Sequence, residues 1–215
     1  MKTSTFVLTG ILLMGSFAST RAADPAAFTR AADPAGASQM AMAFTGVTVM
    51  TSETTGICIA YWPIIGDLDI KSLFAGHVFG APIADKEHAY LIFVSDWRMT
   101  VLPPNGAFNF LGLFLPGEAT IYYSKRPDLR DWHDPSDRST WGKPVAKFVR
   151  SAGLFQSADE GVSGTVTFSL ALTSSSTFTM DGKPFNFRTL IPYGMTCFET
   201  GIGDVESGTC VANGQ

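Results

Sequence analysis

The chain has 215 residues, of which 46% are hydrophobic and 16% are charged, and its formal net charge is −4. An acidic chain is poorly suited to neutralising phosphates, so the composition argues against nucleic acid as a partner. The hydrophobic fraction argues against extensive disorder, because disordered segments lack the apolar residues that build a core.

The first 22 residues have the features of a secretory signal peptide. Lys2 supplies a positive charge, residues 6–18 form an uncharged, mostly apolar run, and small residues near Ala22 offer a cleavage site. The run is shorter than the roughly 20 apolar residues that a membrane-spanning helix needs. We therefore expect a secreted or periplasmic protein with no membrane insertion after cleavage.

Removal of that segment would also remove Lys2 and Arg21, leaving 13 basic against 19 acidic residues and a net charge of −6. Residues 23–38 are rich in Ala and Pro, and the motif RAADPA occurs at residues 21–26 and again at residues 30–35. This composition indicates a flexible spacer. Residues 39–215 are expected to form a single all-β domain.

Short strand-like runs separated by turn residues fill most of this domain. The clearest run is residues 165–172, where Val166, Phe168 and Leu170 alternate with small or polar residues at a period of two. Asp181 and Gly182 then predict a hairpin turn between two apolar arms. In chain order, the runs before this hairpin cover residues 44–51, 57–62, 89–95, 99–102, 108–115, 119–124, 145–150 and 165–172.

No long window shows helical periodicity, so the pattern is typical of an antiparallel β fold. We expect an antiparallel β-sandwich, with a closed β-barrel as the alternative, and in either case one long charged loop. Local patterns do not separate these two architectures.

The three cysteines have different surroundings. Cys197 and Cys210 flank a polar, glycine-rich stretch and are expected to form a disulfide in an oxidising compartment. Cys58 lies in an apolar run and is expected to be a buried free thiol. A bond from Cys58 to one of the other two stays open as an alternative.

The long charged loop, residues 124–140, carries the residue types that bind metals. Asp131, His133, Asp134 and Asp137 lie within seven residues of one another, and His77 and His88 are the other two imidazoles of the chain. If folding brought these side chains together, they could hold a divalent metal. Their spacing matches no metal-binding motif, and basic neighbours could neutralise the acids. A solvated loop is therefore the simpler interpretation, and no cofactor is expected.

Aromatic residues exceed what a small core requires, so some are candidates for contact with a ligand. The pairs Trp97–Arg98 and Trp132–His133 place an aromatic ring beside a polar side chain, and the candidate ligand contacts are Trp97, Arg98, Trp132 and Trp141.

The sequence contains no G-x-S-x-G, no phosphate-binding loop, no dinucleotide-binding fingerprint and no C-x-x-C. We therefore expect a non-enzymatic binding or interaction module for an unknown small-molecule or protein ligand. The alternative is a metal-dependent, hydrolase-type enzyme that uses the 124–140 loop. A second alternative is a structural protein of the envelope or cell surface.

Overall fold

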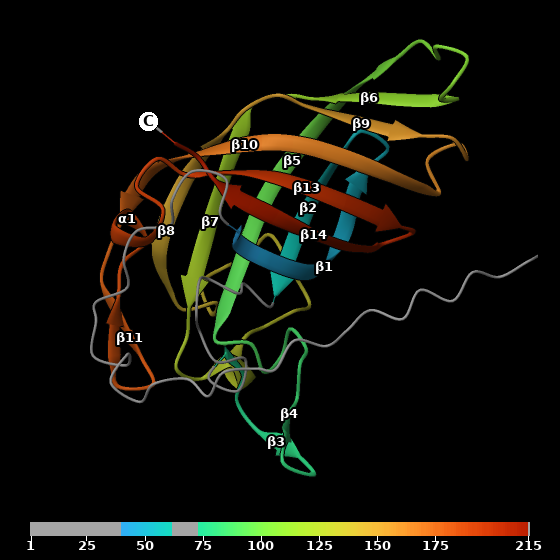
Figure 1. The fold of residues 1–215 in the computed structure, drawn as a ribbon. Coiled ribbons are helices and arrows are strands. Elements are labelled where there is room, and N and C mark those ends of the chain that lie inside the picture. Colours follow the sequence, from blue (N-terminus) through green and yellow to red (C-terminus); the bar gives the residue numbers. More distant parts are fainter. Residues whose placement is uncertain (1–39, 62–72, 215) are drawn as a thin grey trace, which may run out of the picture. The chain divides into compact units, whose positions relative to one another are not determined.

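Antiparallel strands that follow one another along the chain close into a barrel (Figure 1). The computed structural model describes residues 40–61 and 73–214, so the predicted signal peptide and spacer lie outside the described residues. The described part belongs to one compact unit, residues 32–215. The barrel strands are β1 (Met40–Ser52), β2 (Thr55–Tyr61), β5 (Leu91–Leu102), β6 (Phe110–Phe114), β7 (Gly117–Tyr123), β8 (Lys143–Arg150), β9 (Gly153–Ser157), β10 (Ser163–Ser175), β13 (Met195–Ile202) and β14 (Val205–Ala212).

Eight strand positions make the closed wall. Strands β6 and β7 together fill one position, because both pair with β5, and β8 and β9 fill the next, because both pair with β10. Pro116 stands between β6 and β7, where its missing N–H interrupts the ladder. Each position is therefore a neighbour in space of the positions before and after it in the chain.

The barrel closes where β1 pairs with β14, in a register that places Phe44 opposite Gly208. The prediction of an antiparallel all-β fold is confirmed, and the closed barrel, not the favoured sandwich, is the architecture. A sandwich would leave strand edges at each sheet, whereas closure of the ladder removes them.

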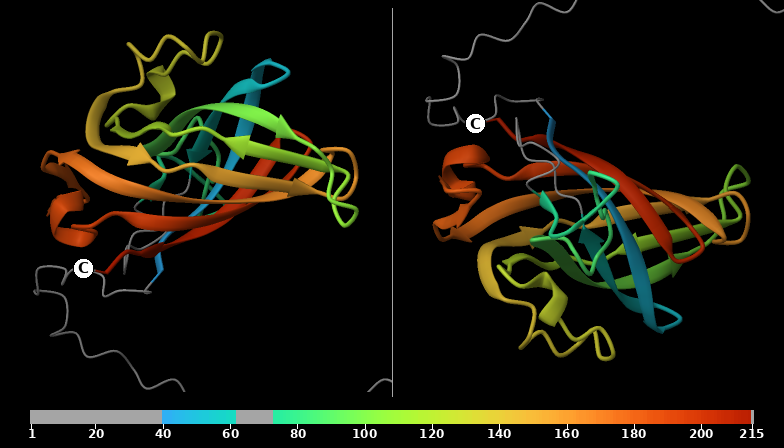
Figure 2. Two further views of the ribbon diagram at one scale, coloured as in Figure 1. Left: turned by 90° about the horizontal axis from the view of Figure 1, so that it is seen from above. Right: turned by 90° about the horizontal axis from the view of Figure 1, so that it is seen from below.

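Buried apolar side chains fill one half of the barrel interior. It holds Phe93, Ile121, Phe148 and Leu170, all at most 1% exposed. The long connections, the hairpin of β11 (Phe178–Met180) with β12 (Lys183–Phe185), and helix α1 (Phe187–Leu190) gather at this end (Figure 2). Phe178 and Phe187 stack at 5.9 Å and join the same core.

The predicted hairpin turn is present. Asp181 and Gly182 both have positive φ, of 51° and 72°, which is the backbone of a two-residue hairpin turn with φ > 0 at both central positions. The predicted alternation in β10 is present as well, since Val166, Phe168 and Leu170 are all buried.

The predicted disulfide joins Cys197 and Cys210, which lie directly opposite each other on β13 and β14. Both face the packed half of the interior and are at most 1% exposed. Cys58 is free and buried, as expected.

The charged loop between β7 and β8 packs on the barrel through a buried arginine. Arg130 is 6% exposed and donates hydrogen bonds to the backbone carbonyls of Ala89, Tyr90 and Trp141. Burial lowers the pKa of its guanidinium to about 10. Trp141 is fully buried, and its indole N–H donates to the carbonyl of Asp131 at 3.1 Å. The loop is therefore an ordered part of the fold, and its segment Pro127–Leu129 is a 3-10 helix.

Two smaller features complete the description. Strands β3 (His77–Val78) and β4 (Ala81–Pro82) form a separate two-stranded hairpin. In the part of the chain that the structure describes, no helix is long and apolar enough to cross a membrane.

Replacing Arg130 tests the role of the loop anchor. Arg130→Met leaves three carbonyls without their donor, so we expect a loss of about 3 kcal/mol in the free energy of unfolding, measured by urea denaturation. Arg126→Met is the matched control, because Arg126 is exposed and its ion pair with Asp128 is solvated. If both variants unfold at the wild-type urea concentration, Arg130 does not anchor the loop.

Candidate functional site

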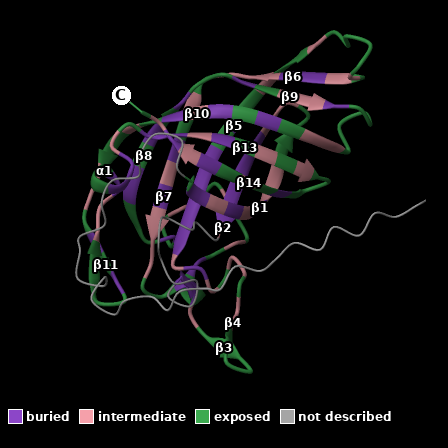
Figure 3. Cartoon of the chain, viewed as in Figure 1, coloured by how far each residue is buried: buried purple, intermediate pink, exposed green. Residues whose placement is uncertain are grey.

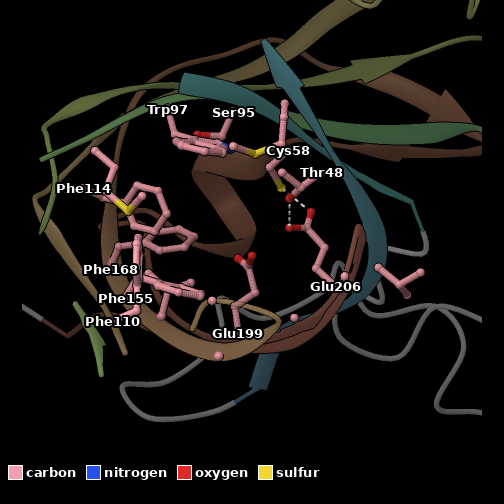
Figure 4. A pocket seen from close by; sticks show the side chains of 18 of the residues that line it. Thr48, Cys58, Ser95, Trp97, Phe110, Phe114, Phe155, Phe168, Glu199 and Glu206 are labelled. Carbon is pink, nitrogen blue, oxygen red and sulfur yellow. Dashed lines mark hydrogen bonds between the residues drawn. The ribbon is translucent and has the colours of Figure 1, made fainter. Parts of the chain in front are cut away.

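The other half of the barrel encloses a cavity of about 270 Å³ (Figure 4). It lies beside the short turns β1–β2, β9–β10 and β13–β14, whose residues Glu53, Gly161 and Gly203 line its mouth. Figure 3 shows that β13 has buried residues at its packed end and intermediate or exposed residues toward the β13–β14 turn. An eight-stranded barrel is just wide enough for side chains to fill it or for one small ligand, and here side chains fill one half while the other half keeps a cavity.

Aromatic side chains form much of the cavity wall. Their ring pairs are edge-to-face, with centroid distances of 5.1 Å for Trp97–Phe114 and 5.9 Å for Phe110–Phe155. This geometry is the favourable one for aromatic pairs and fixes the rings in place. The aromatic lining residues are Trp97, Phe110, Phe114, Phe155 and Phe168.

Inward-facing glycines leave room for neighbouring side chains to lie across the wall of the cavity. A Cβ on Gly112 would come within 1.9 Å of the Met99 sulfur, and one on Gly164 would come within 2.3 Å of the Phe155 ring. Larger residues at these two positions would therefore displace Met99 and Phe155 from the lining.

A buried polar group belongs to the same cavity, centred on Glu206 of β14. Glu206 is 4% exposed and accepts hydrogen bonds from the hydroxyl of Thr48, at 2.8 Å, and from the thiol of Cys58 (Figure 4). Each oxygen of the Glu206 carboxyl therefore accepts one hydrogen bond from a neighbouring side chain.

The thiol of Cys58 donates a hydrogen bond to the carboxyl of Glu206. Burial raises the pKa of its thiol well above the ordinary value, and the carboxyls of Glu206 and Glu199 raise it further. A protonated thiol in such surroundings is unreactive.

Glu199 of β13 is the second carboxyl, and its side chain is directed into the cavity (Figure 4). Burial raises its pKa well above the ordinary value, and the neighbouring Glu206 raises it further, while Arg150 opposes the shift. Two carboxyls that lie side by side disfavour the ionised form of each other, and Glu199 is half-buried beside Glu206.

Arg150 of β8 is the one basic residue of the cavity lining. Its guanidinium donates to the hydroxyl of Ser95 at 2.9 Å and to the carbonyl of Leu115 at 3.1 Å. It also lies near the rings of Phe114 and Phe168, at 5.8 and 5.9 Å. Among the described residues it forms no salt bridge, and its Nε has no hydrogen-bond partner.

Cys58, Glu199 and Glu206 could in principle hold a metal ion. Their ligand atoms lie within 4.8 Å of one another, and within residues 40–61 and 73–214 no other group of three or more His, Cys, Asp or Glu does so. A metal would require the buried thiol to lose its proton.

The residues expected to bind metal do not share a centre. Asp131, Asp134 and Asp137 accept hydrogen bonds from the backbone N–H groups of His133, Ser136 and Ser139 in their own loop. These and the Ser side chains lower the pKa of Asp134 and Asp137, which are exposed.

The two other histidines lie elsewhere. His77 is exposed on the β3–β4 hairpin, and His88 pairs with Asp85 at 2.6 Å. The geometry brings neither histidine into a group with the loop acids in the described part of the chain.

Of the four expected ligand contacts, Trp97 lines the cavity. Arg98 follows it on β5 and points outward, exposed. Trp132 and Trp141 pack against each other in the charged loop, at 5.1 Å. None of these three residues lines the cavity.

Sequence reasoning missed both glutamates of the polar group. The stretch between Cys197 and Cys210 reads as polar, yet it forms a hairpin around Gly203 and Asp204. The signal that could have revealed it is the period of two that runs through the cysteines themselves: Met195, Cys197 and Glu199 on one arm, Glu206, Gly208, Cys210 and Ala212 on the other.

The fold and site thus define an eight-stranded antiparallel barrel with one open, aromatic-walled half. Comparisons with protein-family models, with curated proteins and with solved structures found no match for this chain.

The raised pKa of Glu199 predicts a pH-dependent stability. Because the folded state favours the protonated carboxyl, Glu199 stabilises the fold below its unfolded pKa, near 4.5, and this contribution is lost as pH rises through the folded pKa. Glu199→Gln removes the dependence. We expect this variant to gain stability over the wild type between pH 5 and pH 8, measured by urea unfolding.

Glu118→Gln is the matched control, because Glu118 is exposed on the outer face of β7. Cys58, Glu206 and Arg150, which face Glu199, are the same in all three proteins. Parallel stability profiles for the wild type and Glu199→Gln would contradict the assignment of a raised pKa to Glu199.

Proposed function

We propose that this chain is a binding protein that encloses one small, largely apolar ligand in the open half of the barrel. The observation that carries the proposal is the contrast between the two halves. One half is filled by side chains, whereas the other keeps a cavity walled by five aromatic residues. Small-molecule sites in proteins are typically such concave, mostly apolar spaces with a few placed polar groups.

The rim of the cavity is held by hydrogen bonds. In the β9–β10 turn, Asp159 accepts from the hydroxyl of Ser157 at 2.7 Å, and from the N–H and hydroxyl of Ser163 at 2.8 and 2.6 Å. These bonds hold the pKa of Asp159 at about 2. The residues that follow, Glu160 and Gly161, line the mouth. A fixed rim supports binding to a preformed cavity, which avoids the entropy of ordering a loop.

A fluorescent probe tests the proposal. We expect 1-aminoanthracene, a flat apolar molecule of about 15 heavy atoms, to bind with a Kd on the order of micromolar. Val166→Trp places an indole in the cavity, because Val166 faces inward, and should weaken binding by about tenfold or more. The measurement is fluorescence enhancement during titration of the probe.

Thr167→Trp is the control, since Thr167 is the next residue of β10 and faces outward. Circular dichroism confirms that both variants fold. Equal weakening in both variants, or no probe binding by the folded wild type, would refute a ligand site in the cavity.

We also propose that the protein acts outside the cytoplasm, secreted or in the periplasm. The apolar run near the N-terminus and the Cys197–Cys210 disulfide support this proposal, since disulfides persist in oxidising compartments. We expect the mass of the exported protein to lack about the first 22 residues. Recovery of the chain with Met1 intact and only in the cytoplasm would contradict export.

A further inference from the structure

The residues that line the cavity carry more acidic groups than basic groups. Among the described lining residues, four carry a carboxyl, and one, Arg150, carries a basic group. Two of the carboxyls, Glu53 and Glu160, lie at the mouth and are exposed, so solvent screens them. Inside the barrel, two carboxyls therefore face one guanidinium.

Side chains of the interior donate hydrogen bonds to only one of those two carboxyls. Glu206 is satisfied by Thr48 and Cys58, and Arg150 supplies one positive charge nearby. Among the described residues, no hydroxyl, amide or guanidinium donates a hydrogen bond to Glu199, and its carboxyl interacts with that of Glu206. Ionised, this second carboxyl would lack a hydrogen-bond partner among the described residues.

Aromatic rings line the space in front of Glu199. Figure 4 shows Glu199 on one side of the cavity and the cluster of Phe110, Phe155 and Phe168 beside it, with Trp97 across the space. The face of an aromatic ring attracts an organic cation, and a carboxylate at the same site adds an ion pair.

We propose that the ligand carries an ammonium group, which binds at the Glu199–Glu206 carboxyl pair while its apolar body lies against the aromatic wall. This inference rests on the proposed binding function and names its ligand class. The ammonium supplies the positive charge that an ionised Glu199 needs as a partner. Any proton that Glu199 carries leaves to solvent on binding, so that the site then holds two carboxylates, one guanidinium and one ammonium. No covalent bond forms or breaks in the ligand.

A matched pair of probes isolates the charge. Benzyltrimethylammonium and 2,2-dimethylpropylbenzene have the same shape, but a quaternary nitrogen in the first replaces a carbon in the second. We expect the cation to bind the purified protein at pH 7.5 at least about tenfold more tightly, by isothermal titration calorimetry. Titration in two buffers of different ionisation enthalpy should show net proton release with the cation and none with the hydrocarbon.

Variants test whether the Glu199 carboxyl causes the preference for the cation over the hydrocarbon. Glu199→Gln should lower the affinity for the cation by at least about tenfold, abolish proton release, and leave the affinity for the hydrocarbon unchanged. Glu118→Gln changes the same charge on the outer wall and should leave all three quantities at wild-type values.

The outcomes separate this inference from the proposed function. Equal or tighter binding of the hydrocarbon, with 1-aminoanthracene still bound, overturns the ammonium inference and leaves the cavity as a ligand site. Failure of all three probes overturns both. A third outcome is that Zn²⁺ displaces 1-aminoanthracene, that benzyltrimethylammonium does not, and that Cys58→Ser abolishes the effect of Zn²⁺. This outcome overturns the inference in favour of a metal site at Cys58, Glu199 and Glu206.

Discussion

The pairing of β1 with β14 is the constraint on which the rest of the structure depends. It joins the first described strand to the last and turns a row of strands into a closed wall. A closed wall has no unpaired edge, and its inward-facing residues must either fill the interior or enclose a space. The Cys197–Cys210 bond lies in the hairpin that forms one side of this closure. The hairpin that closes the barrel also carries Glu199 and Glu206 into the interior.

The interior of the barrel therefore has one half filled by side chains and one half that keeps a cavity. Leucine, isoleucine and phenylalanine side chains fill one half, and the hydrophobic effect there stabilises the wall. The other half gives up part of that stabilisation by keeping space and by burying polar groups. Glu206 is offset by the hydrogen bonds it accepts, and Arg150 by those it donates. Burial and the neighbouring Glu206 raise the pKa of Glu199, and a carboxyl with such a shifted pKa is a candidate for contact with a ligand.

Much of the fold could be read from the sequence, because local rules govern it. The alternation in β10 and the turn at Asp181 and Gly182 depend on a few adjacent residues, and both are present. The choice between sandwich and barrel depends on the β1–β14 ladder, which joins residues more than 150 positions apart. No local pattern encodes that pairing, so the barrel could only be an alternative.

The site was harder to predict because its residues break the patterns that sequence reasoning uses. Glu199 and Glu206 occupy inward positions where an apolar residue would signal a strand. The charged loop drew attention through its composition, but its buried contacts come from Arg130 and Trp141, which anchor it. Trp97 was the one expected contact that lines the cavity.

Nuclear magnetic resonance of methionine methyl groups tests the central claim most directly. Met50 and Met99 line the cavity, whereas Met42 and Met195 are buried in the packed core. The account predicts that titration with benzyltrimethylammonium shifts the methyl signals of Met50 and Met99 through the ring current of the bound aromatic group, and leaves those of Met42 and Met195 in place. Unchanged signals from Met50 and Met99 at saturating probe would contradict a ligand-binding cavity in the open half of the barrel.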